Sequence, residues 1–487
     1  MKHILVFLVL LITTSVVGQD NDITSNLYET YNKYKEPTIS KRRIKHKDLQ
    51  PLIAKLKSNS KYTVKKVGRS IEGRDLTLIS IGSGKTNVFL WSQMHGDEPT
   101  ATQAIFDIFN FFNSPDFLEE KEAILSNVTL HFLPMLNPDG AEKFTRRNAL
   151  GVDMNRDAVS LQSPESQTLK RIRDSLNADF GFNLHDQSTY YNAEHTDKPA
   201  TISYLAPAYN YEKDINEVRA NAMKVIVFMN SIIQKYAPGQ VGRYDDAFEP
   251  RAFGDNIQKW GTSAILIESG GYKNDKEKQE IRRLNYVSIL SAIYSIAKEN
   301  YKSITIDDYE KIPENDRKLF DLKIIGATYN LLNHDYKIDL GINLLEMDND
   351  THSSYYNIAK VMDQGDLSTY YGYNTFDASG YKIVEGKVYP KTFKSVDDIS
   401  NIDVFELLKS GYTYLQIDEL PKNKKDTSIP INLIKTGYKV PKLVLMPGAN
   451  STFLLQKGNT IEFAVINGFP INLKTKESHF KNALIYK

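Results

Sequence analysis

Short apolar runs alternate with amphipathic segments between about residues 87 and 298. The runs have the length of buried strands, and the last of them (SAILI) is continuous, as in strands that are covered on both faces. Strands are expected over 87–93, 128–136, 180–184 and 263–267. Apolar residues at helical spacing predict helices over 99–112, 164–176, 212–236 and up to about 298. Strands separated by helices predict an α/β fold, a mainly parallel mixed sheet with helices on both faces.

The pattern changes beyond about residue 301, where a charged segment precedes a stretch rich in β-branched and aromatic residues. We expect a linker over 303–320 and a β-rich C-terminal domain over 321–487, to which the sequence assigns no role. Its strands should form an antiparallel module. The segments expected to be strands are 336–345, 431–434 and 442–446, and the one expected to be a helix is 395–408.

The first residues have the pattern of a signal peptide. Lys2 precedes an apolar run over 4–17, and Gly18 supplies a small residue for cleavage. The run is shorter than the ~20 residues that a membrane-spanning helix needs, which disfavours the alternative of an uncleaved anchor. We therefore expect a signal peptide over 1–18 and export to the periplasm or the extracellular space. No later run is long enough to span a bilayer, so no membrane span is expected in the mature chain.

A polar leader is expected over 19–44, ahead of the α/β domain at 45–302. The leader carries a basic run of Lys41, Arg42 and Arg43, which we expect to be solvated surface charges. The alternative, which the sequence favours less, is a leader that wraps onto the first domain.

Composition and charge narrow the possible functions. The 487 residues include 61 Lys and Arg against 60 Asp and Glu, a net charge of +1. Such a balance gives no overall field to attract nucleic acid, so no nucleic-acid partner is expected. The chain has 0 Cys, which removes disulfides, thiolate metal sites and cysteine nucleophiles together. Histidine and carboxylate remain as the strong metal ligands.

Candidate ligands follow the ends of separate predicted strands. His95 and Glu98, three residues apart, come directly after the strand at 87–93, and such a spacing lets both side chains turn toward one ion. His185 and Glu268 end two further strands, and Arg146 lies beyond another. In open α/β sheets ligands bind outside the carboxyl ends of the strands, so these positions favour one shared site over isolated polar residues.

Taken together, the motifs resemble those of the zinc metallocarboxypeptidases related to carboxypeptidase A. The resemblance covers roughly residues 45 to 300 and depends on several motifs in the same order and spacing. These are His95-x-x-Glu98, NPDG at 137–140, Arg146-x-Asn148, GVDMNR at 151–156, His185, and IESGG at 267–271.

The resemblance implies a role for each matching residue. His95, Glu98 and His185 would hold one Zn²⁺ ion and leave a fourth position for water. Glu268 would be the general base, and Arg146 would stabilise the oxyanion.

The resemblance also implies residues that bind the substrate. Asn155 and Arg156 would bind the carboxylate of the substrate's last residue. Arg147, next to Arg146, is a further substrate-binding candidate that is able to exchange roles with it. Tyr244 is the candidate for the mobile tyrosine that closes over the bound terminus.

The resulting hypothesis is an exported zinc metallocarboxypeptidase that hydrolyses the C-terminal bond of peptides or proteins. Two alternatives stay open at this point. One is a zinc deacylase or amidase acting on N-acyl amino acids or cell-wall peptides. The other is a catalytically inactive peptide-binding protein, which the complete set of motif residues disfavours.

Overall fold

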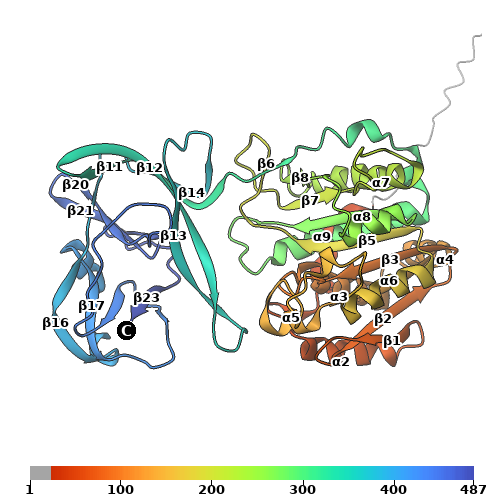
Figure 1. Cartoon of the computed structure of the whole chain (residues 1–487), viewed down its shortest axis with the longest axis horizontal. Coiled ribbons are helices and arrows are strands. Elements are labelled where there is room, and N and C mark those ends of the chain that lie inside the picture. The colour runs from red at the N-terminus through yellow and green to blue at the C-terminus, as the bar shows by residue number, and fades with distance from the viewer. Residues whose placement is uncertain (1–22) are drawn as a thin grey trace, which may run out of the picture.

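The computed structural model describes residues 23–487, so the signal peptide expected over 1–18 lies outside the described residues. The described chain forms an N-terminal α/β domain up to residue 316 and a C-terminal β-rich domain from residue 319, which lie side by side (Figure 1). Within residues 23–487, no helix combines the length and the apolar character needed to cross a bilayer.

An eight-stranded mixed sheet forms the centre of the N-terminal domain, in the order β1-β2-β4-β3-β5-β9-β7-β8. The four strands β4-β3-β5-β9 run parallel to one another, whereas β1 and β2 at one edge and the β7/β9 pair are antiparallel. The strands are β1 (Thr63–Arg69), β2 (Asp75–Gly82), β3 (Thr86–Ser92), β4 (Val128–Leu133), β5 (Phe180–Asp186), β7 (Ile202–Leu205), β8 (Val241–Arg243) and β9 (Ser263–Ser269). The predicted mixed, mainly parallel sheet is confirmed.

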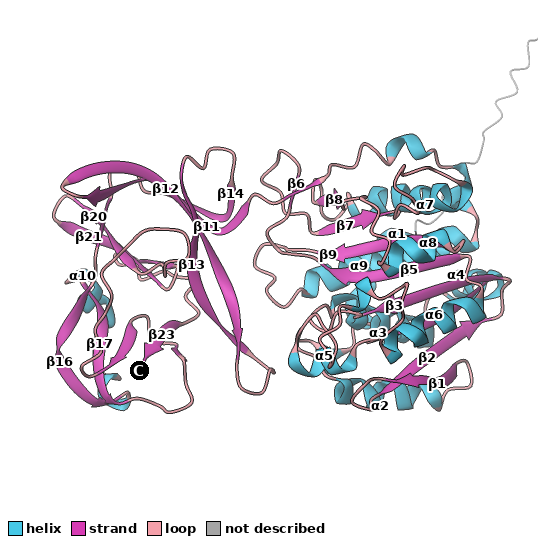
Figure 2. Cartoon of the chain, in the orientation of Figure 1, coloured by secondary structure: helices cyan, strands magenta, loops and turns pink. Residues whose placement is uncertain are grey.

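Helices cover both faces of this sheet, as Figure 2 shows. On β3, Val88 and Leu90 pack with α3, α7 and α9, whereas Phe89 and Trp91 face α6 and α8; all four side chains are fully buried. Burial on both faces explains why the central strands are continuous apolar runs. The helices are α1 (Ile23–Thr30), α2 (His46–Lys57), α3 (Thr100–Asn113), α4 (Leu118–Asn127), α5 (Pro138–Lys143), α6 (Pro164–Leu176), α7 (Glu217–Ile233), α8 (Phe253–Lys259) and α9 (Gln279–Ala297).

Side-chain caps set where two of these helices begin. Helix α6 starts at Pro164, and the Ser163 hydroxyl accepts a hydrogen bond from the Ser166 amide. Helix α7 starts at Glu217, later than the predicted residue 212, because Asn216 caps it by accepting from the Arg219 amide.

The leader packs onto the N-terminal domain and also reaches the C-terminal domain. The expectation that the basic run is solvated is wrong for two of its residues. The Arg42 guanidinium pairs with Glu346, and Arg43 Nη1 lies 2.6 Å from Asp348 Oδ1; the two arginine side chains are only 11% and 5% exposed. Acidic partners on the C-terminal domain allow these charges to be buried.

Two sheets build the C-terminal domain. The first has the order β13-β12-β11-β15-β20-β21-β22, with β14 paired to β11, and the second has the order β16-β17-β19-β23-β18. The strands are β11 (Leu319–Leu331), β12 (His334–Asp348), β13 (Tyr355–Gly365), β14 (Tyr371–Asp377), β15 (Lys382–Val384), β16 (Lys387–Ser395), β17 (Tyr412–Glu419), β18 (Asp426–Thr427), β19 (Asn432–Lys435), β20 (Phe453–Lys457), β21 (Thr460–Ile466), β22 (Phe469–Asn472) and β23 (Ala483–Tyr486). The chain between the domains contributes β10 (Asn315–Asp316), which pairs with β6 (Asn192–Ala193).

Three expectations for this domain need correction. The expectation of antiparallel pairing is wrong for the second sheet, because β16, β17, β19 and β23 pair in parallel. Residues 442–446 form no strand, and the Leu443 amide donates to the Glu385 carboxylate instead of to a neighbouring strand. The helix expected over 395–408 is interrupted: a short 3-10 turn at Asp397–Ile399 precedes α10 (Val404–Lys409), whose N-cap Asp403 accepts two amide hydrogen bonds.

Candidate active site

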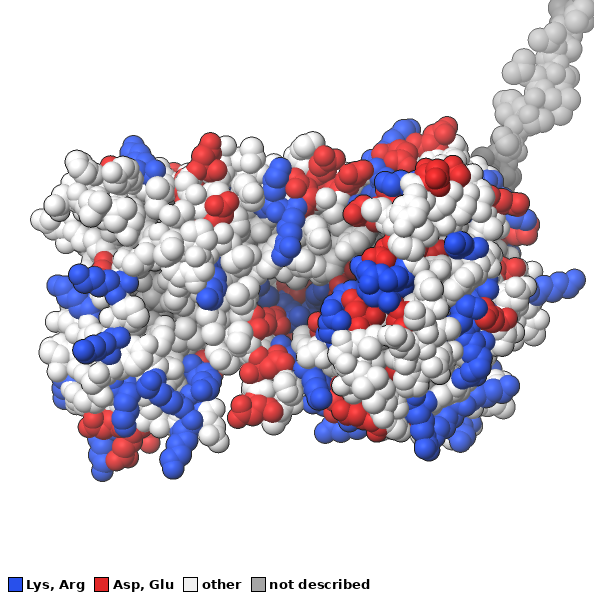
Figure 3. All heavy atoms as spheres, in the orientation of Figure 1, with Lys and Arg blue, Asp and Glu red and all other residues white. Residues whose placement is uncertain are grey.

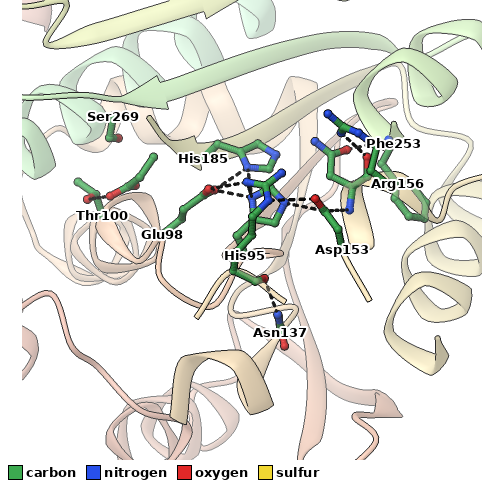
Figure 4. A network of polar contacts seen from close by, with 12 residues as sticks. His95, Glu98, Thr100, Asn137, Asp153, Arg156, His185, Phe253 and Ser269 are labelled. Atoms are coloured by element: carbon green, nitrogen blue, oxygen red, sulfur yellow. Dashed lines mark hydrogen bonds and ion pairs between the residues drawn. The ribbon is translucent and has the colours of Figure 1, made fainter. Parts of the chain in front are cut away.

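The carboxyl ends of β3, β5 and β9 bring the candidate residues together. His185 lies on β5, and its register partner on β9 is Glu268. His95 and Glu98 lie in the turn that joins β3 to α3. Figure 4 shows the side chains of His95, Glu98 and His185 pointing toward one another. A parallel sheet places such strand ends at one edge, which is why residues far apart in sequence meet here.

The two imidazoles and the carboxylate form a compact buried group. His95 Nδ1 lies 2.8 Å from Glu98 Oε1, and His185 Nδ1 lies 2.6 Å from Glu98 Oε2. The two Nδ1 atoms are 3.2 Å apart. One ligand atom from each residue falls within 4.8 Å of the others. Two nitrogens and a carboxylate oxygen are donors that suit zinc.

Hydrogen bonding and charge leave His95 and Glu98 in the forms that bind a cation. His95 Nε2 lies 3.1 Å from Asp153 Oδ1, so the proton of the neutral ring is held on that side and Nδ1 keeps its lone pair. Burial by itself would raise the pKa of Glu98, but the His95 and His185 imidazoles outweigh it and hold that pKa well below its usual range. Glu98 is therefore a carboxylate, the form that coordinates a metal.

Arg146 borders the same group. Its Nη1 lies 3.0 Å from His95 Nδ1 and 3.4 Å from Glu98 Oε1, and its Nε donates to Asp153 Oδ2 at 2.9 Å. Asp153 thus orients both an imidazole and a guanidinium. The role of Asp153 was not predicted from the sequence, although the residue lies inside the GVDMNR motif between Arg146 and Asn155.

The environment of Glu268 differs from that of Glu98. Burial, and then the charges of Glu98 and Asp186, raise the pKa of Glu268 well above its usual value. A carboxyl group with a raised pKa is suited to exchange protons at neutral pH.

Arg156 lies beyond Asp153, away from Glu98 (Figure 4), and Asn155 precedes it in the chain. The Asn155 side-chain oxygen accepts from the Phe253 amide at 2.9 Å, which ties this loop to α8. Arg156 Nε lies 3.2 Å from Glu249 Oε2, and the arginine side chain is 39% exposed. The guanidinium is therefore accessible to a further anion.

The last two candidates are placed differently from each other. Arg147 donates to the Gly151 carbonyl at 2.9 Å and makes no contact with the histidine pair. Tyr244 follows β8, with its ring centroid 6.3 Å from that of Tyr191. Burial and then the charge of Glu268 raise the pKa of Tyr244.

A second ion pair adjoins the histidines and was not identified from the sequence. Lys278 Nζ lies 3.0 Å from Asp186 Oδ2 and donates to the Ser269 carbonyl at 2.8 Å. The Thr100 hydroxyl also donates to Asp186. Asp186 is thus a hydrogen-bond acceptor next to His185. Lys278 lies outside every motif, so only its position after β9 hinted at a contact with the site.

Comparison with known proteins supports the sequence motifs. Residues 52–263 match a family model described as zinc carboxypeptidase. The resemblance of this part of the chain to the zinc carboxypeptidases is confirmed. Carboxypeptidase E of Caenorhabditis elegans is 30% identical over 122 residues, which is 21% of this chain and 26% of that protein. Carboxypeptidase SOL1 of Arabidopsis thaliana is 28% identical over 176 residues, 30% of this chain and 35% of that protein.

The family model lies within the N-terminal domain, and the curated relatives match only part of their own length. The chain spans about a quarter to a third of the length of these curated relatives. Among solved structures, carboxypeptidase A of Helicoverpa armigera has a TM-score of 0.43 at 15% identity, covering 57% of this chain and 80% of that one. A metallo-carboxypeptidase of Pseudomonas aeruginosa has a TM-score of 0.41 at 18% identity, with 52% and 69% covered.

Proposed function

We propose that the chain is an exported zinc metallocarboxypeptidase that hydrolyses the C-terminal peptide bond of peptides or proteins. The observation that carries the proposal is the convergence of His95 Nδ1, His185 Nδ1 and the Glu98 carboxylate, with the two nitrogens 3.2 Å apart. The zinc carboxypeptidase family match over the same segment supports it. Export depends on the signal peptide expected from the sequence.

The three converging side chains would be the zinc ligands. Their buried nitrogen and oxygen donors fit that ion, and Asp153 leaves the correct nitrogen of His95 free. Zinc would supply Lewis-acid polarisation of the scissile carbonyl and would make a water molecule more acidic.

Glu268 would be the proton carrier of the reaction. Its carboxylate takes a proton from the water that attacks the scissile carbonyl, and it later gives a proton to the nitrogen of the departing amino acid as the C–N bond breaks. The raised pKa of Glu268 supports this role, because a group that holds its proton more tightly is a stronger base. Burial beside Glu98 supplies that shift.

Arg146 would stabilise the negative charge that develops on the carbonyl oxygen. Its guanidinium is held by Asp153 at one nitrogen, while a second nitrogen faces His95 and Glu98. A fixed donor at this point costs no reorganisation during the reaction, and losing one such donor typically lowers the rate by about 10²–10³.

The free carboxylate of the substrate would bind Arg156 and Asn155. An arginine grips a carboxylate in a two-pronged way, and an internal peptide bond presents no such charge. In this arrangement Arg156 exchanges its partner Glu249 for the substrate. Tyr244 would close over the bound residue, whereas the contact of Arg147 with Gly151 leaves it the weaker candidate for a substrate contact.

A digest of a mixed peptide library tests this function. Peptides with a free C-terminal carboxylate should lose single residues from that end, and a chelator should stop the reaction. Matched peptides that end in an amide should resist cleavage. Equal rates on the two forms would indicate an endopeptidase, release of acyl groups alone would indicate a deacylase, and binding without cleavage would indicate an inactive peptide-binding protein.

A further inference from the structure

We propose that the C-terminal domain forms one wall of the substrate site, and that the cavity between the domains binds the part of a peptide that precedes the scissile bond. This inference rests on the proposed carboxypeptidase function. It assigns a binding role to a domain that the family match over 52–263 does not include.

A cavity of about 1480 Å³ lies between the two domains and extends to the metal-ligating group. Glu98 and Asp186 from the N-terminal domain line it on one side, whereas Glu346, Thr375 and other residues of the C-terminal domain line it on the other. Figure 3 shows the surface hollowed between the domains, with charged side chains of both signs around the hollow. The cavity therefore has walls from both domains and reaches Glu98, one of the three converging side chains.

The direction of a bound peptide follows from the site. Arg156, which would hold the terminal carboxylate, does not line the cavity, whereas Glu98 does. In Figure 4, Arg156 lies to one side of the histidine pair, and Glu98 and Thr100, the partner of Asp186, lie to the other. A peptide with its last residue at Arg156 and its scissile carbonyl at the histidines must continue past Glu98. That path enters the interdomain cavity.

Direct contacts fix the C-terminal wall beside the site. The Tyr373 hydroxyl of β14 donates to the Thr189 carbonyl, four residues after His185. The Tyr190 hydroxyl donates to Asp321 Oδ2 at 2.8 Å, and Lys276 Nζ lies 2.9 Å from Asp321 Oδ1. These bonds join β14 and β11 to the segments that follow β5 and β9. Hydrogen bonds and an ion pair thus hold this part of the C-terminal domain next to the candidate site.

The lining suits an extended peptide of several residues. The volume exceeds the ~300–1,000 Å³ typical of small-molecule pockets, so a single N-acyl amino acid would leave most of the cavity unfilled. Asn374 and Thr375 are exposed residues of β14 that line the cavity together with the aromatic Phe376. Amide and hydroxyl groups can bond to a peptide backbone of any sequence, and aromatic rings supply apolar contact.

Substitution of Thr375 by Trp tests the wall. Thr375 is exposed on β14 and lines the cavity from the C-terminal domain, so a bulky side chain there narrows the cavity at that wall. Two substrates with the same two C-terminal residues are compared, an N-acetyl dipeptide and an octapeptide. For Thr375→Trp we expect kcat/KM on the octapeptide to fall by about tenfold or more, while kcat/KM on the dipeptide stays within about twofold.

Controls separate this inference from the proposed function. Thr392→Trp, at an exposed position on β16 outside the cavity, should leave both rates unchanged. If Thr375→Trp fails to fold, Asn374→Trp takes its place and should show the same selective loss on the octapeptide. Equal effects of the cavity variants on the two substrates, or no effect on either, would overturn the role of the wall. If the wild type hydrolyses neither substrate, the proposed function fails first. In that case, an octapeptide affinity that Thr375→Trp leaves unchanged would also refute the proposed binding role of the C-terminal domain.

Discussion

Two buried glutamates next to the histidine pair have pKa values that are shifted in opposite directions. Burial raises the pKa of both groups; at Glu98 the two imidazoles outweigh it and lower the pKa, whereas at Glu268 the charges of Glu98 and Asp186 raise the pKa further. Neighbouring charges rather than residue type thus separate a metal ligand from a proton carrier. Such a separation of pKa values is a guide to acid–base assignments.

Glu268→Gln should separate metal binding from catalysis. The amide keeps the size of the side chain but accepts no proton, so we expect hydrolysis to fall by about 10²–10⁴. Zinc content should remain stoichiometric, since Glu268 is not in the ligand group. Peptide turnover and metal analysis of the purified variant measure the two properties. Glu299→Gln, at an exposed glutamate, is the matched control, and substantial turnover by Glu268→Gln would exclude Glu268 as the base.

His131 should make the unfolding free energy depend on pH. Burial lowers its pKa from 6.5 to about 4, and its ring bonds to the Ser80 hydroxyl and the Asn87 side chain. Between these two values the unfolded chain binds a proton that the folded chain does not, so stability falls as pH decreases from about 6.5 toward 4. His131→Gln should therefore show a weaker loss over this window in urea unfolding. His195→Gln, at an exposed histidine, should match the wild type, and equal slopes for all three would contradict the prediction.

At the scale of elements, a buried ion pair fastens the leader to α3 and α9. Arg282 and Asp107 are both 0% exposed and bonded to each other. Arg282 also donates to the Glu36 and Ile39 carbonyls, each at 2.9 Å, and Asp107 accepts from the Tyr31 hydroxyl. The pair satisfies backbone groups of a segment that has little regular structure of its own.

Arg282→Met should destabilise the N-terminal domain strongly. The substitution leaves Asp107 buried without its cation and removes the donors to the leader, so we expect a loss of about 3–5 kcal/mol. Thermal or urea unfolding followed by circular dichroism measures it. Arg283→Met on the same helix is the control, because that guanidinium bonds to the Tyr28 carbonyl and leaves no fully buried acid behind. A similar loss in both variants would argue against a special role for the pair.

The sequence predicted elements best where burial leaves a strong pattern. The central strands β3, β5 and β9 are buried on both faces and read as apolar runs. The edge strand β1 contains Lys65 and Lys66 and is largely exposed, so it gave no such signal. Strand direction in the second C-terminal sheet was missed because alternation of side chains is the same in parallel and antiparallel pairs.

The site was predictable where the motif residues themselves form it. His95, Glu98, His185 and Arg146 converge as the strand ends indicated. Lys278 was missed because a buried lysine next to Asp186 depends on folding of the chain after β9, which no local pattern encodes. The basic run was misread for the same reason, since its acidic partners lie some 300 residues away in sequence.

At the scale of the whole molecule, charged side chains of the leader join the two domains. Arg42 pairs with Glu346 on β12 and lies over the Tyr355 ring of the C-terminal domain, 5.5 Å from its centroid. The Arg43 guanidinium contacts the same ring, 5.0 Å from its centroid. A polar interface of this kind depends on complementary charges more than on apolar area.

A double-mutant cycle on Arg42 and Glu346 should measure how strongly the domains are coupled. Their side chains are only 11% and 27% exposed, so solvent screens the pair less than it screens a surface pair. Glu346→Ala leaves Arg42 buried without its acid, whereas Arg43 keeps Asp348. We expect the single substitutions to be non-additive by about 0.5–3 kcal/mol in urea unfolding.

The same double-mutant cycle on an exposed ion pair gives a reference value for the coupling free energy. Lys302 and Glu299 are both more than half exposed on the N-terminal domain, so their coupling should be smaller and should fade in high salt.

Weakening the interface should also allow the domains to unfold separately, so calorimetry of Glu346→Ala should show a broader or divided transition than the wild type. Strict additivity at Arg42 and Glu346, together with an unchanged transition, would mean that other contacts hold the C-terminal domain beside the site.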